Sequence, residues 1–109
     1  MSARAIGDMR RRLVIEAPIE TVDDNGGASR VYVGAGEIWA HVMPLRMTHG
    51  FAAAREEQVV THHVTFRFRN GVDVAMRFRD GQRIFYIRAV EDVDERRTHL
   101  RALCEEIKA

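Results

Sequence analysis

The sequence predicts a mainly β fold. The spacing of its strands indicates a small antiparallel barrel or sandwich, and of these we expect the β-barrel, with a long loop or short helix inserted between two strands. Apolar and polar residues alternate with a period of two in several short stretches, as half-buried strands require. Pairs of Asn, Asp and Gly separate these stretches and supply the turns. With 109 residues, the chain can form one domain around one modest core. We expect residues 9–109 to form this domain and residues 1–8 to be a flexible N-terminal arm.

The first strand is expected around Leu13 and Ile15, which alternate with the charged residues Arg12 and Glu16. Apolar residues at every second position place one face of a strand against a core. Pro18 then either ends regular strand pairing or marks the edge of a sheet, because proline has no backbone N–H to donate.

The strongest turn signal in the chain is the sequence Asp-Asp-Asn-Gly-Gly at residues 23–27, since Asn and Gly tolerate positive φ. An extended stretch follows over residues 29–33, and a second one, centred on a tryptophan, covers residues 37–43. Gly34 and Gly36 lie between the two stretches and indicate a bulge or bend.

Residues 46–58 change in character from the stretches before them. They contain Ala, Glu and Arg, which favour helices, and they lack the alternation of a strand. We therefore expect one or two helical turns within a long excursion between two strands. Excursions of this length in a small domain are usually functional or mobile.

The clearest strand of the sequence covers residues 60–69, where His62 and the apolar residues 60, 64, 66 and 68 should point one way and the polar residues between them the other. Asn and Gly at residues 70–71 predict a turn into a strand over residues 74–79. Asp and Gly at residues 80–81 predict a second turn into a strand over residues 83–90. The strands that should share the barrel core are those around Leu13, Trp39, Phe66, Phe78 and Phe85.

The segment 97–107 is compatible with two structures. Four apolar residues from Leu100 to Ile107 have the i, i+3, i+4, i+7 spacing of a helix, and local propensity favours that structure. Every second residue from Leu100 to Cys104 is also apolar, as in a strand that closes the barrel.

Composition argues against several classes of function. The net charge is +1, from 17 basic and 16 acidic residues, so the chain lacks the overall basic field of many nucleic-acid-binding proteins. No apolar stretch approaches the roughly 20 residues that a membrane helix needs. The single cysteine, Cys104, has no partner for an intrachain disulfide, and its apolar neighbours favour a buried structural thiol over a nucleophile.

No metal site, cofactor site or catalytic group is expected. The adjacent His62 and His63 should point to opposite faces of a strand and therefore not bind one ion together. The sequence has no CxxC or HExxH spacing. The carboxylates of Asp92 and Asp94 lie in a turn close to basic residues, where solvated ion pairs are the common outcome.

Four arginines, Arg67, Arg69, Arg77 and Arg79, occupy outward positions on two strands that a tight turn should join. We therefore expect them to form a single basic patch. Such a patch can hold phosphates, or it can pair with acidic residues of a neighbouring subunit, such as those at residues 91–95. The near-zero net charge favours contact with a subunit or another protein over contact with DNA.

Several stretches, each weak alone, match one known family in their order and spacing along residues 9–107. They are residues 9–15, 23–27, 37–45, 61–69, 76–78, 81–87, 93–96 and 103–106. Together they resemble the phage head–tail joining family, also called head-completion or stopper proteins. Residues 51–55 depart from the family pattern, because its members vary there.

This resemblance implies a virion protein that is not an enzyme and that needs no cofactor. It implies a small barrel whose copies form a ring, 6- or 12-fold, between the portal or adaptor and the tail-terminator protein. It also implies that a loop faces the packaged DNA in the channel, which here would place Thr48, His49, Phe51 and Arg55 toward the DNA. The resemblance favours a strand for residues 97–107.

Related proteins occur in bacterial gene transfer agents, which are phage-like particles. The implied location is therefore the neck of a phage or phage-like particle, after synthesis in the bacterial cytoplasm and without a membrane. The alternative reading is a free-standing nucleic-acid-binding β-barrel. It would use Arg67, Arg69, Arg77 and Arg79 together with Phe or Tyr side chains on which bases stack.

Overall fold

The computed structural model describes residues 10–45 and 59–107 of the chain. Their secondary structure consists of strands and contains no helix, which confirms the prediction of a mainly β, antiparallel fold. The predicted N-terminal arm and the predicted insertion at residues 46–58 lie outside the described residues. The strands are β1 (Arg11–Val22), β2 (Ala28–Pro44), β3 (His62–Arg67), β4 (Arg77–Asp80), β5 (Arg83–Asp92) and β6 (His99–Glu106).

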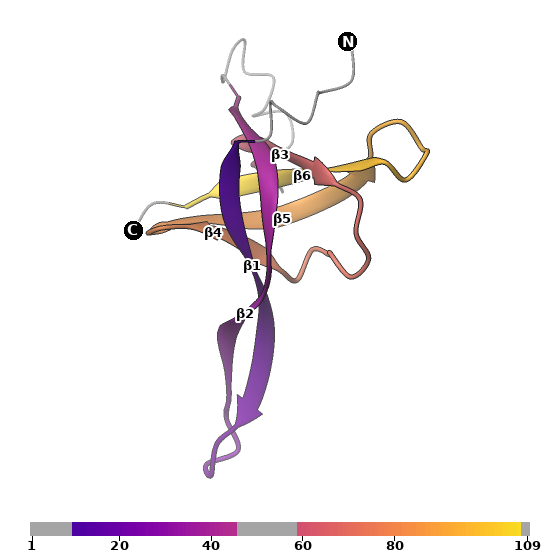
Figure 1. The fold of residues 1–109 in the computed structure, drawn as a ribbon. Coiled ribbons are helices and arrows are strands. Elements are labelled where there is room, and N and C mark those ends of the chain that lie inside the picture. The colour runs from indigo at the N-terminus through magenta and orange to yellow at the C-terminus, as the bar shows by residue number, and fades with distance from the viewer. Residues whose placement is uncertain (1–9, 46–58, 108–109) are drawn as a thin grey trace.

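The six strands form one antiparallel sheet that closes on itself (Figure 1). Their order around the closed barrel is β1-β2-β3-β6-β5-β4, and pairing of β4 with Val14–Glu16 of β1 completes the circle. The segment that was compatible with either a helix or a strand is therefore β6, which pairs with β3 and β5. Closure leaves the barrel strands without unpaired edges where they meet.

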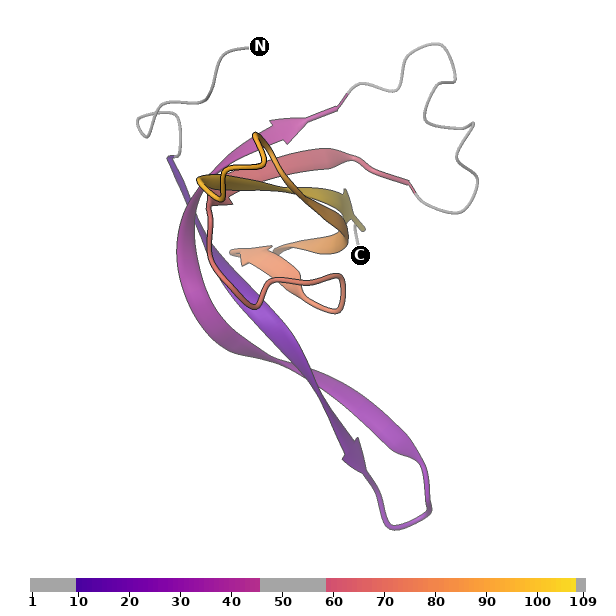
Figure 2. The same ribbon diagram turned by 90° about the vertical axis from the view of Figure 1, so that its right-hand side faces the viewer.

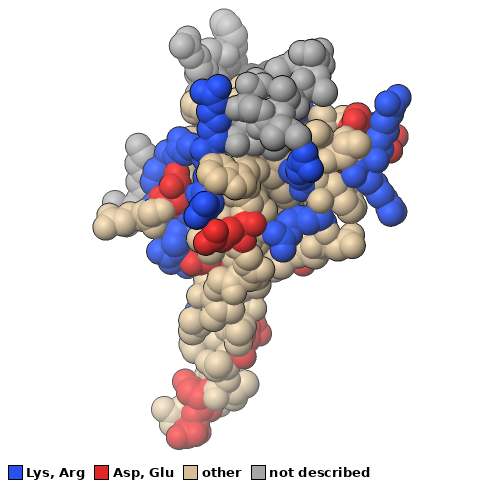
Figure 3. Space-filling view, in the orientation of Figure 1, with Lys and Arg blue, Asp and Glu red and all other residues tan. Residues whose placement is uncertain are grey.

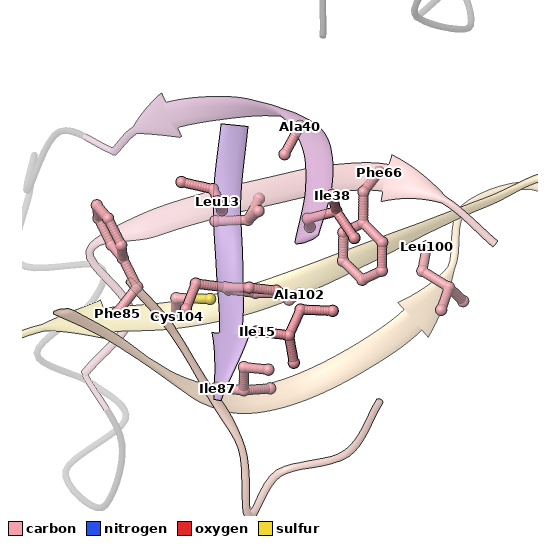
Figure 4. Packing of buried hydrophobic residues seen from close by; sticks show 12 residues of the cluster. Leu13, Ile15, Ile38, Ala40, Phe66, Phe85, Ile87, Leu100, Ala102 and Cys104 are labelled. Atoms are coloured by element: carbon pink, nitrogen blue, oxygen red, sulfur yellow. The ribbon is translucent and has the colours of Figure 1, made fainter. Parts of the chain in front are cut away.

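Twelve buried apolar residues from all six strands fill the barrel (Figure 4). Phe66, Phe78 and Phe85 are fully buried, and the rings of Phe66 and Phe78 meet edge to face with centroids 5.6 Å apart. Alternate residues point inward because the side-chain period of a strand is two. The other members of the core are Leu13, Ile15, Ile38, Ala40, Val64, Ile87, Leu100, Ala102 and Cys104.

The strand around Trp39 belongs to the barrel, but its largest side chain does not enter the core. The indole is 54% exposed, whereas its neighbours Ile38 and Ala40 are buried. Ala40 pairs with Phe66 of β3, and this register turns the even-numbered residues of this part of β2 inward. The small Ala40 side chain leaves room for the phenyl ring opposite.

The strands β1 and β2 continue beyond the barrel as a two-stranded hairpin, residues 17–33, that protrudes from it (Figures 1 and 2). The two halves of the hairpin pair in register from Ala17↔Val33 to Val22↔Ala28. Pro18 does not end the strand, because β1 continues for four residues beyond it. β4 pairs with β1 only at Val14–Glu16, so Pro18 lies on an open edge.

The turn predicted at residues 23–27 forms the tip of this protruding hairpin. The carboxylate of Asp23 accepts hydrogen bonds from the backbone N–H groups of Asn25, at 3.0 Å, and Gly27, at 2.7 Å. Gly26 has a φ of 83°, a conformation that glycine adopts without steric cost. The local sequence therefore determines where the hairpin turns.

Candidate interaction surfaces

The structure does not join Arg67, Arg69, Arg77 and Arg79 into one patch, so that part of the prediction is wrong. β3 pairs with β2 and β6, whereas β4 pairs with β1 and β5, and two strands separate β3 from β4 in either direction around the barrel. The Asn-Gly pair at residues 70–71 begins a longer connection to β4 instead of a tight hairpin. The backbone N–H of Phe68 donates a hydrogen bond to the backbone carbonyl of Thr98, just before β6, at 3.0 Å. The chain after β3 therefore continues beside this segment and does not turn back directly into β4.

Arg77 and Arg79 bind a carboxylate of their own chain. The Nε atom of Arg77 lies 2.6 Å from Oε1 of Glu16, and the Nε atom of Arg79 lies 2.7 Å from Oε2. The Arg77 guanidinium also stacks on the ring of Tyr32, 3.8 Å from its centroid, and donates to the Tyr86 hydroxyl at 3.3 Å. We call these five residues the Glu16 cluster.

The Glu16 cluster holds the base of the protruding hairpin against the barrel. Tyr32 belongs to the hairpin, whereas Arg77 and Tyr86 belong to the barrel strands β4 and β5. The side chains of Glu16 and Arg77 are 9% and 15% exposed, so their interaction is partly shielded from solvent screening. Arg77 therefore connects two parts of the molecule and is not a free surface cation.

The surroundings of Glu16 lower the pKa of its carboxyl group. Burial alone would raise the pKa of this carboxyl, but hydrogen bonds from Arg79 and Arg77, together with their charges, outweigh burial and lower the pKa below its ordinary value of 4.5. Glu16 is therefore ionised at neutral pH, as the paired arginines require. The alternation of the sequence predicted that Glu16 is polar and points outward. Its side chain is nevertheless buried, because Arg77 and Arg79 cover it.

A bulge separates the barrel part of β1 and β2 from the protruding hairpin. Ile15 pairs with Gly36 but Glu16 pairs with Gly34, so Ala35 is an extra residue in β2. A bulge of this kind bends a strand and increases its twist. Gly36 has a φ of 149°, and a Cβ atom there would lie 3.1 Å from the Arg69 guanidinium. Glycine at this position permits both the backbone conformation and the approach of Arg69.

A second surface lies on the outer side of β1, β2 and β3 around the exposed indole. The Arg12 guanidinium stacks on Trp39, 5.0 Å from the ring centroid, and lies 3.8 Å from the Glu37 carboxylate. Arg67 occupies the next ladder position after the Phe66↔Ala40 pair, so it lies beside Trp39. We call Arg12, Glu37, Trp39 and Arg67 the Trp39 face.

The Trp39 face carries an excess of positive charge. It has two arginines, Arg12 and Arg67, and one glutamate, a net charge of +1. Within the described part of the chain, Arg67 and Arg69 form no ion pair. Figure 3 shows basic side chains, with acidic ones among them, around uncharged surface on the face of the barrel turned toward the viewer. Contact with a protein therefore remains our prediction for Arg67 and Arg69.

The protruding hairpin offers a third surface with a different character. Pairing places Ala17 with Val33 and Ile19 with Val31 on one face of the hairpin. Ile19 is 48% exposed and Val31 52% exposed. The tip beyond them is acidic, as Figure 3 shows at the far end of the hairpin. The hairpin therefore combines an apolar face with a negative tip.

The remaining points raised by the sequence are Cys104, the question of a metal site and the residues predicted to face a channel. Cys104 is fully buried, and this burial raises the pKa of its thiol to about 12, which confirms a structural cysteine. No group of three or more potential metal ligands occurs among the described residues. In the same residues, no helix is long and apolar enough to cross a membrane. Thr48, His49, Phe51 and Arg55, predicted to face a channel, lie outside the described residues.

The acidic segment predicted to pair with another copy is engaged within its own chain. Glu91 binds Arg101 at 2.9 Å, and the Asp92 carboxylate accepts a hydrogen bond from the backbone N–H of Arg97 at 2.9 Å. Asp94 likewise accepts bonds from the Thr98 hydroxyl and the Arg96 backbone. These acids stabilise the turn between β5 and β6.

Sequence reasoning overlooked the Trp39 face and the apolar face of the hairpin. The signal for the hairpin was present, because Ala17 and Ile19 alternate with polar or turn-favouring residues, as do Val31 and Val33. Alternation indicates which residues share a face, but it does not show that the rest of the chain leaves this face uncovered.

The structure is similar to the solution structure of protein SF1141 from Shigella flexneri 2a, with a TM-score of 0.72 and 23% identity over 94% of this chain and 96% of that one. It is also similar to a chain in the virion of a native gene transfer agent particle, with a TM-score of 0.66 and 26% identity over 92% of this chain and 96% of that one. Among curated proteins, none matches. The family model that describes the phage head completion protein matches residues 4–107, and the chain therefore belongs to the phage head completion protein family.

Proposed function

We propose that this protein is a head–tail connector, or stopper, subunit of a tailed phage or of a phage-like gene transfer agent. Family membership makes it a structural component of the particle and not an enzyme. Beyond that, we propose that its copies form a ring between the portal or adaptor and the tail-terminator protein. The ring helps to retain the packaged DNA.

The observation that carries this proposal is the similarity to the virion chain of the gene transfer agent. It extends over 92% of this chain and over 96% of the other, so it concerns nearly the whole of both chains and not a fragment. The surfaces of the molecule support the same function. Exposed apolar and basic faces on a small closed barrel are suited to contacts between proteins.

We propose that the basic residues divide their roles according to their surroundings. Arg67 and Arg69 contact a neighbouring subunit or another connector protein. Arg77 and Arg79 support such contacts from within the chain, because they bind Glu16 at 2.6 and 2.7 Å and so fix the base of the hairpin. Charge reversal at Arg67 and Arg69 should block incorporation into the connector and leave the chain folded.

We also propose that the segment containing Thr48, His49, Phe51 and Arg55 faces the DNA channel in the assembled ring. Its composition differs from that of the strands on either side, and it connects β2 to β3. Replacing residues 48–55 with a Gly-Ser linker should spare the barrel and reduce DNA retention or tail attachment. Normal DNA retention in particles that contain the linker variant would remove this role.

Mass measurement and electron microscopy of the purified protein with its portal complex test the proposed function directly. We expect a ring of 6 or 12 copies bound on the portal or its adaptor. A protein that never joins the portal complex, or that joins it as isolated copies, would contradict the ring.

The alternative nucleic-acid-binding reading is less consistent with the aromatic residues. Phe66, Phe78 and Phe85 are fully buried, and the rings of Tyr32 and Tyr86 meet the Arg77 guanidinium. These rings therefore offer no free platform for bases, which leaves the exposed indole of Trp39 as the candidate for stacking in this alternative. Salt-sensitive DNA binding by the isolated chain, lost on charge reversal at Arg67 and Arg69 while assembly stays normal, would favour the alternative.

A further inference from the structure

The protruding hairpin and the Trp39 face are complementary surfaces that do not meet within one chain. Figures 1 and 2 show the hairpin extending away from the barrel, with its tip at the far end of the molecule. The Trp39 face lies on the barrel part of β2, on the barrel side of the bulge at residues 34–36. A contact between the two surfaces therefore requires a second molecule.

The apolar side of the contact comes from the hairpin. Ile19, Val31 and Val33 share one face of the hairpin, and they are 48%, 52% and 40% exposed. On the barrel, the exposed indole of Trp39 provides an apolar surface of matching kind, 54% exposed. Burying such side chains against each other is favourable in proportion to the apolar area removed from water.

The charges of the two surfaces are also complementary. Glu20 pairs with Arg30 across the hairpin at 3.2 Å, so the net charge of the hairpin comes from Asp23 and Asp24 at its tip, a charge of −2. The Trp39 face carries a charge of +1 around its indole, from two arginines and one glutamate. Opposite charges of this kind orient two proteins and reject wrong partners.

We propose that the protruding hairpin of one copy docks on the Trp39 face of an adjacent copy, with its apolar face over Trp39 and its acidic tip toward Arg67. This inference rests on the proposed ring and names the surfaces that form it. The contact joins two different surfaces of identical chains. Such head-to-tail contacts repeat from copy to copy and generate rings when the rotation closes.

The Glu16 cluster fixes the orientation of the hairpin relative to the barrel before the hairpin docks. Arg77 binds Glu16 and stacks on Tyr32, so the hairpin leaves the barrel in a fixed direction before any partner arrives. Association then orders fewer groups, which reduces the entropy that binding costs.

Two matched variants test the contact. The hairpin variant, Ile19→Ser with Val31→Ser, removes the apolar face, and the barrel variant, Trp39→Ala, removes the indole. Val22→Ser is the control, because Val22 is 78% exposed but lies on the opposite face of the same hairpin. Thermal unfolding of each variant verifies that the barrel is intact.

Sedimentation equilibrium of each purified chain measures self-association. We expect the wild type and Val22→Ser to associate equally, and the hairpin and barrel variants to associate roughly 10- to 100-fold more weakly, as removal of a central apolar anchor predicts. An equimolar mixture of these two variants retains one intact contact, between the hairpin of the Trp39→Ala chain and the Trp39 face of the other. The mixture should form a 1:1 dimer that does not grow further.

Three results would overturn the hairpin contact: association of the two variants at wild-type strength, a mixture that stays monomeric, or a wild type that stays monomeric at its solubility limit. None of them decides the proposed function, which the copy number in the portal complex measures separately. A portal complex that contains a ring of either variant would retain the connector and exclude the hairpin as its subunit contact. Absence of the wild type from that complex would remove the connector itself.

Discussion

The barrel part and the protruding part of β1 and β2 belong to the same two strands but have opposite surroundings. In the barrel, Leu13 and Ile15 are 0% and 2% exposed, whereas Ile19 and Val22 in the hairpin are 48% and 78% exposed. Both parts alternate or nearly alternate, so local sequence does not separate them. The bulge at residues 34–36 marks the boundary between the barrel part and the hairpin part. Burial therefore depends on whether another element covers a face, and not on the pattern of the strand.

The same contrast divides the arginines. Arg77 and Arg67 both point outward from a barrel strand, yet Arg77 is enclosed by Glu16 and two tyrosines, and Arg67 forms no ion pair with the described residues. A structural cation and a candidate contact residue can therefore have the same position in an alternating pattern. Substitutions in the two regions should separate effects on folding from effects on assembly.

The largest effect on stability is expected in the barrel core. Phe66→Ala removes a fully buried ring that packs against Phe78, and it should lower the free energy of unfolding by about 3–5 kcal/mol. Ile19→Ala in the hairpin is the matched comparison and should change it by less than about 0.5 kcal/mol. Urea unfolding at neutral pH measures both. Equal losses in the two variants would show that the hairpin belongs to the cooperative core.

A smaller effect is expected where the hairpin joins the barrel. Arg77→Ala removes a donor from the buried Glu16 carboxylate and a stacking partner from Tyr32. It should lower the free energy of unfolding by about 1–3 kcal/mol, because a buried acceptor loses a charged partner. Arg67→Ala should remain within about 0.5 kcal/mol of the wild type. An Arg77→Ala variant with the same free energy of unfolding as the wild type would contradict the role of the Glu16 cluster.

The bulge should respond to a single methyl group. Gly36→Ala introduces a side chain at a φ of 149° and brings Cβ to 3.1 Å from the Arg69 guanidinium, which should cost about 1–2 kcal/mol of stability. At Gly34, the nearest atom to an added Cβ is Val14 Cγ1, at 3.8 Å, and φ is not in the left-handed region. Gly34→Ala should therefore be close to neutral. Thermal unfolding of the pair measures the difference, and similar melting temperatures would show that the bulge tolerates an alanine.

The smallest effect is a dependence on pH. The pKa of Glu16 is lowered in the folded chain, so its ionised form stabilises the fold above the ordinary pKa of 4.5. This contribution is lost as the pH falls through the lowered pKa. Glu16→Gln should therefore be less stable than the wild type at pH 7, and the gap should narrow in acid. A gap that stays constant from pH 7 to strongly acidic conditions would show that the charge of Glu16 is not responsible.

Part of the fold follows from local sequence. The hairpin tip was predictable because Asp23, Asn25 and Gly26 supply the hydrogen bonds and the positive φ that the turn needs. The strand β3 was predictable because Val64 and Phe66 alternate with polar residues. The resemblance correctly favoured a strand for β6, where helical and strand spacing coexist.

The rest depends on contacts between distant segments. Whether β3 and β4 pair is decided by β1 and β6, which compete for the same edges. The carboxylate that binds Arg77 lies 61 residues away in the sequence, and no local pattern indicates it. The outward orientation of Trp39 follows from its register against β3, whereas size and hydrophobicity alone favour the core.

The central claim is that the barrel is stable within one chain, whereas the hairpin is stabilised by contact with an adjacent copy. Hydrogen exchange of the hairpin and the barrel tests this claim most directly. The assembled wild type is compared with the Trp39→Ala chain, which we expect to be monomeric. In the monomer, amides at residues 19–22 and 28–31 should exchange much faster than those of β3. In the assembly, the hairpin amides should become at least about tenfold more protected, and those of β3 should change little. A hairpin as protected as β3 in the monomer, or one that gains no protection on assembly, would contradict the claim that an adjacent copy stabilises the hairpin.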